Sequence, residues 1–446
     1  MDNFLLLSDT IKESWQRIGK PQRVLIAYSG GADSSALLMA LRRLNKLQDG
    51  IPELLAVHVN HHLRPTSTDD AEASRALCDR LHIPFICADV FPRSVSEDHA
   101  RIARYEALYN LAREHACDVI TLAHHLHDQT ETMFMRLMRG TGDGLKGMAE
   151  YVPDTERTPL WRPLLNTHPD LLKQSLEEVS VSWQEDETNR DSRYLRNFIR
   201  LQVLPPLRER APHLDTHMAQ TACILQDEST FLRSLAEDFL SAYASMEPPC
   251  PFMDADAFSA LHIALKRRIV KCLLDAFSLS DSVTFAHIDA GASISIGETV
   301  NLPMGFALYH AGKRIHLLLP SVQPLAIPSL EELPFVTGLS NGKTYQSMPK
   351  SVYAGTCLRH RRSGDYIQPF GMAGQKTLQD YLTDRKVDRP FRDHLPLLCQ
   401  GSEVLWVIGV GASEKMRALP ESHMNILLHY PGRLIMELHN HTTKEL

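Results

Sequence analysis

The first third of the chain alternates between short apolar runs and longer segments with helical spacing of apolar residues. The strand-like runs are Arg23–Tyr28, Glu53–Asn60, Pro84–Val90 and Val119–His124. Helical periodicity marks the segments Ser34–Leu47, Thr68–Leu81, Glu97–His115 and Asp128–Arg139. Because strands joined by crossover helices pair in parallel, this order predicts an α/β fold built on a doubly wound parallel sheet. Such sheets bind their ligands at the carboxyl ends of the strands.

The rest of the chain predicts two further parts. At about 150 residues per domain, 446 residues correspond to about three domains. We expect the α/β domain to cover residues 1–210 and a mainly helical middle domain to cover residues 211–320. A proline-rich stretch places a linker at residues 321–350, and residues 351–446 are expected to form a small α+β domain.

Composition narrows the setting in which the chain works. With a formal net charge of -7, binding to nucleic acid must rely on local basic clusters. None of the eight cysteines forms a C-x-x-C pair, which argues against a zinc ribbon and favours reduced thiols in a cytosol. The N-terminus does not resemble a targeting peptide, and no apolar run reaches the roughly 18 residues of a membrane span. We therefore expect a cytoplasmic protein without membrane contact.

A glycine-rich loop follows the first predicted strand and opens the first predicted helix. It reads Ser29-Gly30-Gly31-Ala32-Asp33-Ser34. Two glycines let the backbone approach an anion closely, and the free N–H groups and dipole of a helix N-terminus favour a phosphate there. An aspartate beside a phosphate is repulsive unless a cation lies between them, so Asp33 is the candidate ligand of Mg²⁺. The alternative is a simple glycine turn with a polar helix cap.

Two better-known phosphate motifs are missing. No G-x-G-x-x-G follows the first strand. The G-K-T sequence Gly342-Lys343-Thr344 lacks the glycine spacing of a Walker A loop, and we interpret it as a surface turn.

The glycine-rich loop resembles the S-G-G-x-D-S signature of the PP-loop ATP pyrophosphatases, which activate a carbonyl oxygen as an adenylate. Later motifs, in the same order, are similar to those of the tRNA(Ile)-lysidine synthetase family. They are Asn60–Arg64, Glu97–Arg101 with Arg104-Tyr105, His124–Thr132, Arg139–Met148, Arg162–Leu165, Asp186–Asn189 and Arg196–Arg200. The similarity is specific over residues 23–205, weaker in the middle, and returns at Arg361–Asp365 and Lys376–Leu382.

This resemblance implies an ATP- and Mg²⁺-dependent ligase. Such an enzyme adenylylates the wobble cytidine in the CAU anticodon of tRNA(Ile) and attaches L-lysine to it, releasing AMP and diphosphate. Residues 1–210 would then form the PP-loop catalytic domain, residues 211–320 a substrate- or tRNA-binding domain, and residues 351–446 a C-terminal tRNA-binding domain. The oligomeric state is not readable from the sequence, and a homodimer is kept as one option.

Positive groups are needed on the attacked phosphorus and on the leaving diphosphate, because negative charge develops there during adenylylation. Arg64 and Lys146 are the candidates for these groups, and His62 is a weaker candidate that we assign to substrate binding.

Carboxylates suit the two amino groups of lysine. Asp33, Asp128 and Glu131 follow strand ends where they could meet, and a carboxylate or histidine near them could take the proton of the attacking amine. The family often has two neighbouring acids where this chain has His127 and Asp128, so only Asp128 takes over a role. A structural metal bound by His124, His127 and Asp128 is a minor alternative that no accompanying motif supports.

Two arginine clusters are candidates for RNA contact. Their members are Arg190, Arg193, Arg196 and Arg200 in the first, and Arg359, Arg361 and Arg362 in the second. Spacings of three and four place the first cluster on one helix face, and guanidinium groups suit phosphates and unpaired bases. From these we choose Arg196, Arg200, Arg361 and Arg362 as substrate-binding residues; pairing with nearby acids is the alternative.

Three other functions remain open at this point. A tRNA thiolase of the same superfamily would commonly carry C-x-x-C pairs, which this chain lacks. A small-molecule amide synthetase would need a source of ammonia, for which no nucleophilic cysteine is placed. A non-catalytic ATP-sensing RNA-binding module would not need the intact loop and Asp128.

Overall fold

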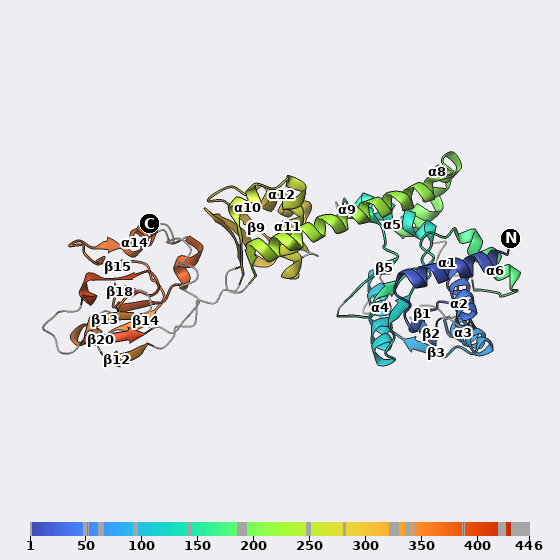
Figure 1. The fold of residues 1–446 in the computed structure, drawn as a ribbon, viewed down its shortest axis with the longest axis horizontal. Helices are drawn as coiled ribbons and strands as arrows, with labels where there is room; N and C mark the ends of the chain where they lie inside the picture. The colour runs from blue at the N-terminus through green and yellow to red at the C-terminus, as the bar shows by residue number, and fades with distance from the viewer. Residues whose placement is uncertain are drawn as a thin grey trace. The chain divides into compact units, whose positions relative to one another are not determined.

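The computed structural model describes residues 2–47, 51, 53–60, 67–91, 97–140, 144–154, 156–184, 194–246, 251–279, 282–320, 330–334, 340–341, 345–385, 387, 389–417 and 425–429. The chain divides into two compact units, Met1–Leu232 and Arg233–Leu446 (Figure 1). Within the described residues, no helix is both long enough and apolar enough to cross a membrane. The expected G-K-T turn at 342–344 lies outside the described residues.

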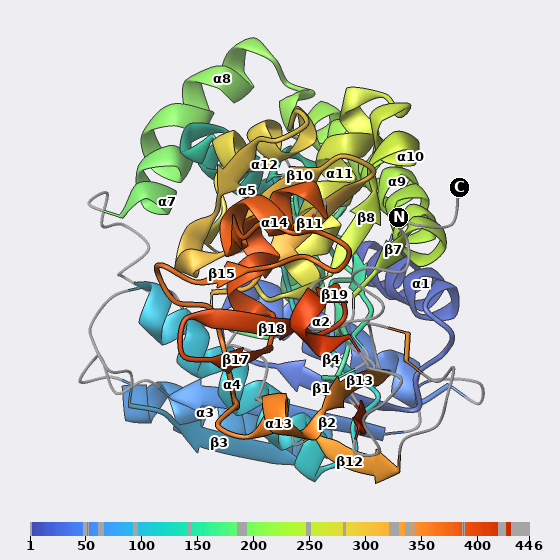
Figure 2. The same cartoon turned by 90° about the vertical axis from the view of Figure 1, so that its left-hand side faces the viewer.

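A six-stranded sheet forms the centre of the first unit. Its strands are β1 (Arg23–Ala27), β2 (Glu53–Asn60), β3 (Phe85–Asp89), β4 (Val119–Thr121), β5 (Tyr151–Val152) and β6 (Leu160–Trp161). The order is β3-β2-β1-β4-β6-β5, and all neighbours are parallel except β5 and β6. Figure 2 labels the first four of these strands, β3, β2, β1 and β4. The chain proceeds from β1 outwards to β3 and then returns to β4 on the other side of β1. This order confirms the predicted doubly wound parallel sheet.

Both faces of the sheet are apolar, which explains why the strands read as continuous apolar runs. Val24 and Ile26 of β1 belong to the core on one face, while Leu25 belongs to the core on the opposite face. The first core is closed by helices α1 (Asn3–Arg17), α2 (Ala32–Asn45), α3 (Ser67–Leu81) and α6 (Pro169–Glu178). Helix α4 (Glu97–Glu114) closes the second core through Leu108 and Ala112.

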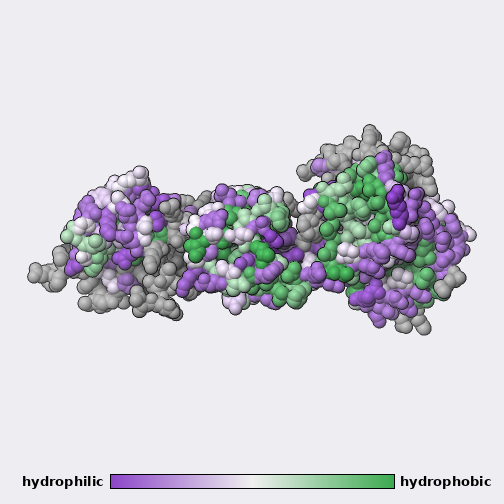
Figure 3. Space-filling view, turned by 90° about the horizontal axis from the view of Figure 1, so that it is seen from above, coloured by the Kyte–Doolittle hydropathy of each residue, from purple (hydrophilic) through white to green (hydrophobic). Residues whose placement is uncertain are grey.

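The remaining helices of the first unit follow β4 in the sequence. They are α5 (Leu126–Arg139), η1 (Gly144–Lys146), α7 (Leu195–Phe198), the π-helical turn η3 (Ile199–Val203), α8 (Leu204–Arg210) and α9 (Leu214–Tyr243), which continues into the second unit. Hydrophobic residues gather on the face of the first unit seen in Figure 3. Large side chains that stay exposed on these helices include Met138, Phe198 and Leu201. Exposed apolar clusters of this kind are typical of surfaces that contact a partner.

The second unit contains two apolar cores. The first lies between a five-stranded antiparallel sheet, β7-β8-β11-β10-β9, and the helices α10 (Ala255–Ser259), α11 (Ile263–Ala276) and α12 (Phe285–Ala292). The strands are β7 (Ala244–Ser245), β8 (Phe252–Asp254), β9 (Thr299–Asn301), β10 (Ala307–Ala311) and β11 (Arg314–Leu318), with η5 (Pro303–Gly305) between β9 and β10. The structure therefore adds a sheet to the predicted mainly helical part.

The second core of this unit contains Trp406, Tyr381 and Leu397. It is built from β13 (Tyr345–Pro349), α13 (Lys350–Tyr353), β14 (Cys357–Arg359), β15 (Tyr366–Ile367), β16 (Lys376–Thr377), α14 (Leu378–Asp384), η6 (Arg389–His394), β17 (Leu397–Gln400), β18 (Glu403–Val407), β19 (Gly411–Ala412) and η7 (Glu414–Met416). Strands β12 (Glu331–Pro334) and β13 pair with β20 (Asn425–His429). Parts of the predicted linker, 321–350, are thus strands, with prolines at the strand ends, where a missing N–H is tolerated.

Candidate active site

The candidate site lies where the strand order reverses. The loop after β1 leads into α2, and the loop after β4 leads into α5, so both helix N-termini follow the carboxyl ends of neighbouring parallel strands. In open α/β sheets this switch point is where ligands bind. Asp33 in the first turn of α2 and His125 at the N-cap of α5 meet there, with 3.6 Å between Asp33 Oδ2 and His125 Nε2.

The loop after β1 presents an uncapped helix N-terminus. Gly31 is the N-cap of α2, and no side chain accepts from the first N–H groups of that helix. The two serines bond to the loop instead: Ser34 Oγ accepts from the Ser29 N–H at 3.2 Å and lies 3.0 Å from Ser29 Oγ. Free N–H groups with the helix dipole behind them form an anion site. The loop therefore has the geometry expected for phosphate.

Gly30 has a positive φ of +85° and close neighbours. Its carbonyl accepts from the Gln184 N–H at 3.1 Å. A Cβ built on Gly30 would lie 2.7 Å from Gln184 Oε1 and 2.8 Å from Ser74 Oγ. Only glycine adopts this backbone conformation without strain and leaves room for these side chains.

For the ATP-dependent ligase activity that the sequence resemblance implies, Gly30→Ala is expected to slow diphosphate release about 100-fold, because the added methyl group strains the loop and displaces Gln184. Diphosphate release from ATP in the presence of the RNA acceptor measures this. Gly374→Ala is the matched control, because Gly374 has nothing within 4 Å of an added Cβ. Equal rates for the two variants would contradict the proposed phosphate site.

His125 connects the two helix N-termini. Its Nδ1 accepts the backbone N–H of His127 at 3.2 Å, so the proton of a neutral His125 ring lies on Nε2. That Nε2 faces two carboxylates, 3.6 Å from Asp33 Oδ2 and 3.4 Å from Asp128 Oδ2. Asp128 Oδ2 also accepts the backbone N–H of His125 at 3.0 Å, which completes a capping box. The imidazole is thus engaged at both nitrogens.

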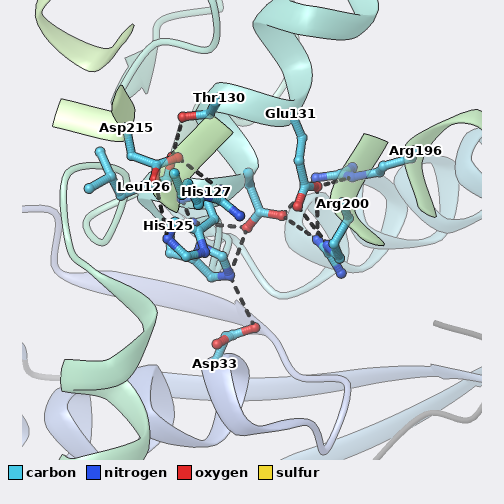
Figure 4. A network of polar contacts seen from close by, with 11 residues as sticks. Asp33, His125, Leu126, His127, Thr130, Glu131, Arg196, Arg200 and Asp215 are labelled. Carbon is cyan, nitrogen blue, oxygen red and sulfur yellow. Dashed lines mark hydrogen bonds and ion pairs between the residues drawn. The ribbon is translucent and has the colours of Figure 1, made fainter. Parts of the chain in front are cut away.

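Two buried acids and two arginines form a compact ion cluster (Figure 4). Arg196 donates to Asp128 Oδ1 at 2.7 Å and to Glu131 Oε2 at 2.9 Å. Arg200 donates to Glu131 Oε1 at 2.6 Å, to Glu131 Oε2 at 2.9 Å and to Asp128 Oδ1 at 3.1 Å. Glu131 is 1% exposed, and a carboxylate so deeply buried requires such cationic partners. This cluster is called the acid–arginine cluster below.

The surroundings of Asp128 in this cluster keep its carboxylate charged. Burial alone would raise the pKa of Asp128, but His125, Arg196 and His124 and the backbone N–H of His125 outweigh it and hold this pKa well below its usual range. Burial lowers the pKa of both arginines, and Asp128 and Glu131 more than compensate, so both pKa values are raised. Asp128, Arg196 and Arg200 are therefore charged at neutral pH.

Asp33 has the opposite tendency. Burial and the negative charge of Asp128 raise its pKa, while His125 opposes this rise. Its side chain remains 40% exposed, so it is the accessible carboxylate at the switch point. Both oxygens of Asp128 already accept hydrogen bonds and its side chain is buried, so Asp33 is the more open of the two carboxylates.

The second contact of α5 is with the start of α9. Asp215 accepts two hydrogen bonds from Arg208, both at 2.8 Å, and a further one from Thr130. His127 Nε2 lies 3.5 Å from Asp215 Oδ2. Burial, then the charge of Arg208, lowers the pKa of His127 to about 4, and Asp215 only partly opposes this. The residue that departs from the family pattern therefore has a specific acidic partner and is neutral at pH 7.

Lys146 lies in a turn that is held by α5 and α9. Gln129 of α5 donates to the Met148 carbonyl at 2.9 Å and accepts the Met148 N–H at 2.7 Å. Gln226 of α9 donates to the carbonyls of Lys146 and Met148 at 2.7 and 2.8 Å. The backbone around Lys146 is therefore fixed from two sides.

The predicted site residues fall into three groups. Ser29–Ser34, Asp33, Asp128, Glu131, Arg196 and Arg200 meet at the switch point, and Lys146 lies in a turn packed against α5. His62 and Arg64, like Arg190 and Arg193, lie outside the described residues. Arg361 and Arg362 belong to the second unit, where Arg361 pairs with Asp393 and the exposed Arg362 donates its backbone N–H to Asp365 at 2.7 Å.

The guanidinium groups of Arg196 and Arg200 pair with Asp128 and Glu131, because two buried carboxylates need cations. Their contact with substrate stays a prediction. A metal bound by His124, His127 and Asp128 is wrong: among the described residues no group of three His, Cys, Asp or Glu side chains could hold a metal ion. Burial instead lowers the pKa of His124 to about 3.

Sequence reasoning missed Asp215, Arg208, Gln226 and Gln184. Each acts through a contact between elements that are distant in sequence, and none lies in a motif. A weak signal was available for one pair, since Arg208 and Asp215 flank the short break between α8 and α9.

A doubly wound sheet with an uncapped, glycine-rich helix N-terminus at its switch point defines a phosphate-binding α/β domain. The family model described as PP-loop domain matches residues 7–207, which contain this domain, and the one described as TilS substrate C-terminal domain matches residues 357–428.

Relatives carry this assignment over nearly the whole chain. The tRNA(Ile)-lysidine synthase of Porphyromonas gingivalis is 32% identical, over 88% of this chain and 90% of that protein. The proteins of the same name from Geobacter sulfurreducens and Caldanaerobacter subterraneus are 28% and 26% identical and cover 92% and 94% of this chain. The alignments span 93% and 96% of the lengths of those two proteins. The chain therefore belongs to the tRNA(Ile)-lysidine synthase family.

Proposed function

We propose that this chain is a tRNA(Ile)-lysidine synthase, a ligase that forms a carbon–nitrogen bond at the expense of ATP. It adenylylates the carbonyl oxygen of the wobble cytidine in the CAU anticodon of tRNA(Ile) and releases diphosphate. An amino group of L-lysine then attacks the carbon of that carbonyl group, and AMP leaves. The observation that carries this proposal is the acid–arginine cluster placed next to an open phosphate loop at one switch point. Relatives of the same name over most of the chain support it.

In the first half-reaction, the loop Ser29–Ser34 binds the phosphates of ATP through its free N–H groups. Asp33 would hold Mg²⁺, which usually binds through one or two carboxylates together with substrate phosphates. The Asp33 side chain is 40% exposed, which fits this arrangement. Bound there, the metal would supply positive charge to the phosphates, and Lys146 and Arg64 neutralise the charge that develops on the leaving diphosphate.

In the second half-reaction, lysine binds at the acid–arginine cluster. Lysine carries one carboxylate and two amino groups, and the cluster offers two guanidinium groups and two carboxylates within hydrogen-bond distance of each other. Asp128 and Glu131 therefore bind amino groups, and Arg196 or Arg200 binds the carboxylate. The attacking amine gives its proton to a carboxylate, because both nitrogens of His125 are already engaged.

RNA binding is distributed over the chain. The target cytidine must leave its stack to reach the switch point. Arg361 and Arg362 of the C-terminal part are proposed to contact the tRNA body, since Arg362 is exposed. The cytoplasmic location and a homodimeric state stay predictions from the sequence.

The experiment is incorporation of radiolabelled lysine into an unmodified tRNA(Ile) transcript with a CAU anticodon, in the presence of ATP and Mg²⁺. A tRNA(Met) transcript is the matched control, because it carries the same anticodon in another body. We expect label on tRNA(Ile) alone and only with ATP. Diphosphate release without lysine transfer to either RNA would reject the lysidine reaction and leave another PP-loop activity, such as a tRNA thiolase.

A further inference from the structure

Helix α9 touches the active site at two separate places within the first unit. Asp215 in its first turn contacts α5, and Gln226, about three turns later, contacts the turn that contains Lys146. Three turns bring a helix back to nearly the same face, so both side chains project from one face of α9. One helix thus contacts a segment assigned to each half-reaction.

The contact of Gln226 determines where the Lys146 backbone lies. The Gln226 amide donates to the Lys146 carbonyl at 2.7 Å and to the Met148 carbonyl at 2.8 Å. Between them, Gly147 has φ +60°, and its carbonyl accepts from Arg136. All three carbonyls of this turn are therefore held by side chains. Losing the Gln226 amide frees the carbonyl of the residue proposed to act on the diphosphate.

The contact of Asp215 determines where the first turn of α5 lies. Asp215 is 6% exposed and binds Thr130 and Arg208, with His127 3.5 Å away. Thr130 and His127 are the chain neighbours of Glu131 and Asp128. Asp215 therefore holds a face of α5 next to the face that carries the acid–arginine cluster; Figure 4 shows Asp215 with Thr130 on one side and Glu131 with Arg196 and Arg200 on the other.

We propose that Gln226 and Asp215 are positioning residues for different half-reactions. Gln226 positions Lys146 for adenylylation, and Asp215 positions Asp128 and Glu131 for lysine. This assignment rests on the proposed function. Neither residue touches ATP or lysine; each acts through the backbone or helix turn that it holds.

The first variant is Gln226→Leu, which keeps the size of the side chain and removes its donor groups. We expect adenylylation, measured as diphosphate release with tRNA(Ile) and no lysine, to slow about tenfold, which is the effect of one lost hydrogen bond on a positioned group. The KM for lysine should stay unchanged. Gln220→Leu is the matched control, because Gln220 is an exposed glutamine of the same helix.

The second variant is Asp215→Asn, which keeps the shape and removes the charge that binds Arg208. We expect the KM for lysine to rise about tenfold while diphosphate release without lysine is unchanged. Asp227→Asn is the matched control, since Asp227 is an exposed aspartate of the same helix.

The two variants test the proposal together. Slower adenylylation in Gln226→Leu alone, together with a higher KM for lysine in Asp215→Asn alone, supports it. Equal losses in both half-reactions for each variant, or a matching fall in the melting temperature, would show a purely structural role and overturn it. The wild-type protein is measured first: if it transfers no lysine to tRNA(Ile), the proposed function fails and this inference fails with it.

Discussion

Asp33→Asn is expected to fold normally and to lose adenylate formation by about 100- to 1000-fold, the usual effect of removing one preorganised charge or donor from a developing charge. The amide has the size of the carboxylate and can still accept from His125, but it carries no charge for Mg²⁺. The half-exposed position of Asp33 explains why the fold tolerates the change. Diphosphate release on the tRNA(Ile) transcript measures the loss.

The control for this variant is Asp170→Asn, since the Asp170 side chain is 70% exposed and lies outside the site. The pH profile adds a second test. Burial, opposed by His125 and reinforced by Asp128, raises the pKa of Asp33, and the proposed role needs the charged form. The wild-type rate should therefore fall as the pH drops through that raised pKa. A full rate for Asp33→Asn would remove Asp33 from the mechanism.

Arg196→Met is expected to lower the stability of the catalytic unit by about 3 kcal/mol, at the lower end of the effect of breaking a buried ion pair. The lower end applies because Arg200 still contacts both Asp128 and Glu131. The same change should raise the KM for lysine, since one guanidinium of the proposed binding site is gone. Urea unfolding followed by tryptophan fluorescence reports this unit through Trp15, Trp161 and Trp183.

Arg17→Met is the matched control for stability. Arg17 lies in the same unit and pairs with Glu150, its side chain is 57% exposed, and exposed pairs contribute about 0–1 kcal/mol. A loss for Arg196→Met no larger than that of this control would mean that the acid–arginine cluster does not stabilise the fold.

Most of the sheet could be predicted because each strand is apolar on both faces. Val24, Leu25 and Ile26 alternate between the two cores, so β1 reads as one apolar run whichever face is considered. Strand bounds differ from the predictions by at most three residues. The largest difference is at the end of β4, which stops at Thr121 although Leu122 still donates its backbone N–H to the Trp161 carbonyl at 2.8 Å.

Predicting the site from sequence succeeded where chain order determines position. Asp33 and Asp128 follow β1 and β4, which are neighbours at the reversal of a doubly wound sheet, so their meeting follows from topology. The partners of Arg196 could not be predicted in this way. Its helix face was visible, but the burial of Glu131 on another helix is a property of the packing. Gln226 gave no signal for the same reason, and Asp215 gave only the weak signal of flanking the break between α8 and α9.

The acid–arginine cluster contains two carboxylates and two guanidinium groups, so it carries no net charge. Such a site produces little field beyond its own contacts, and long-range steering of a cationic amino acid requires an excess of one sign. Selection of lysine must then come from short-range contacts between its charged groups and those of the acid–arginine cluster. The affinity for lysine should therefore depend only weakly on ionic strength, whereas the affinity for the polyanionic RNA should fall as the salt concentration rises.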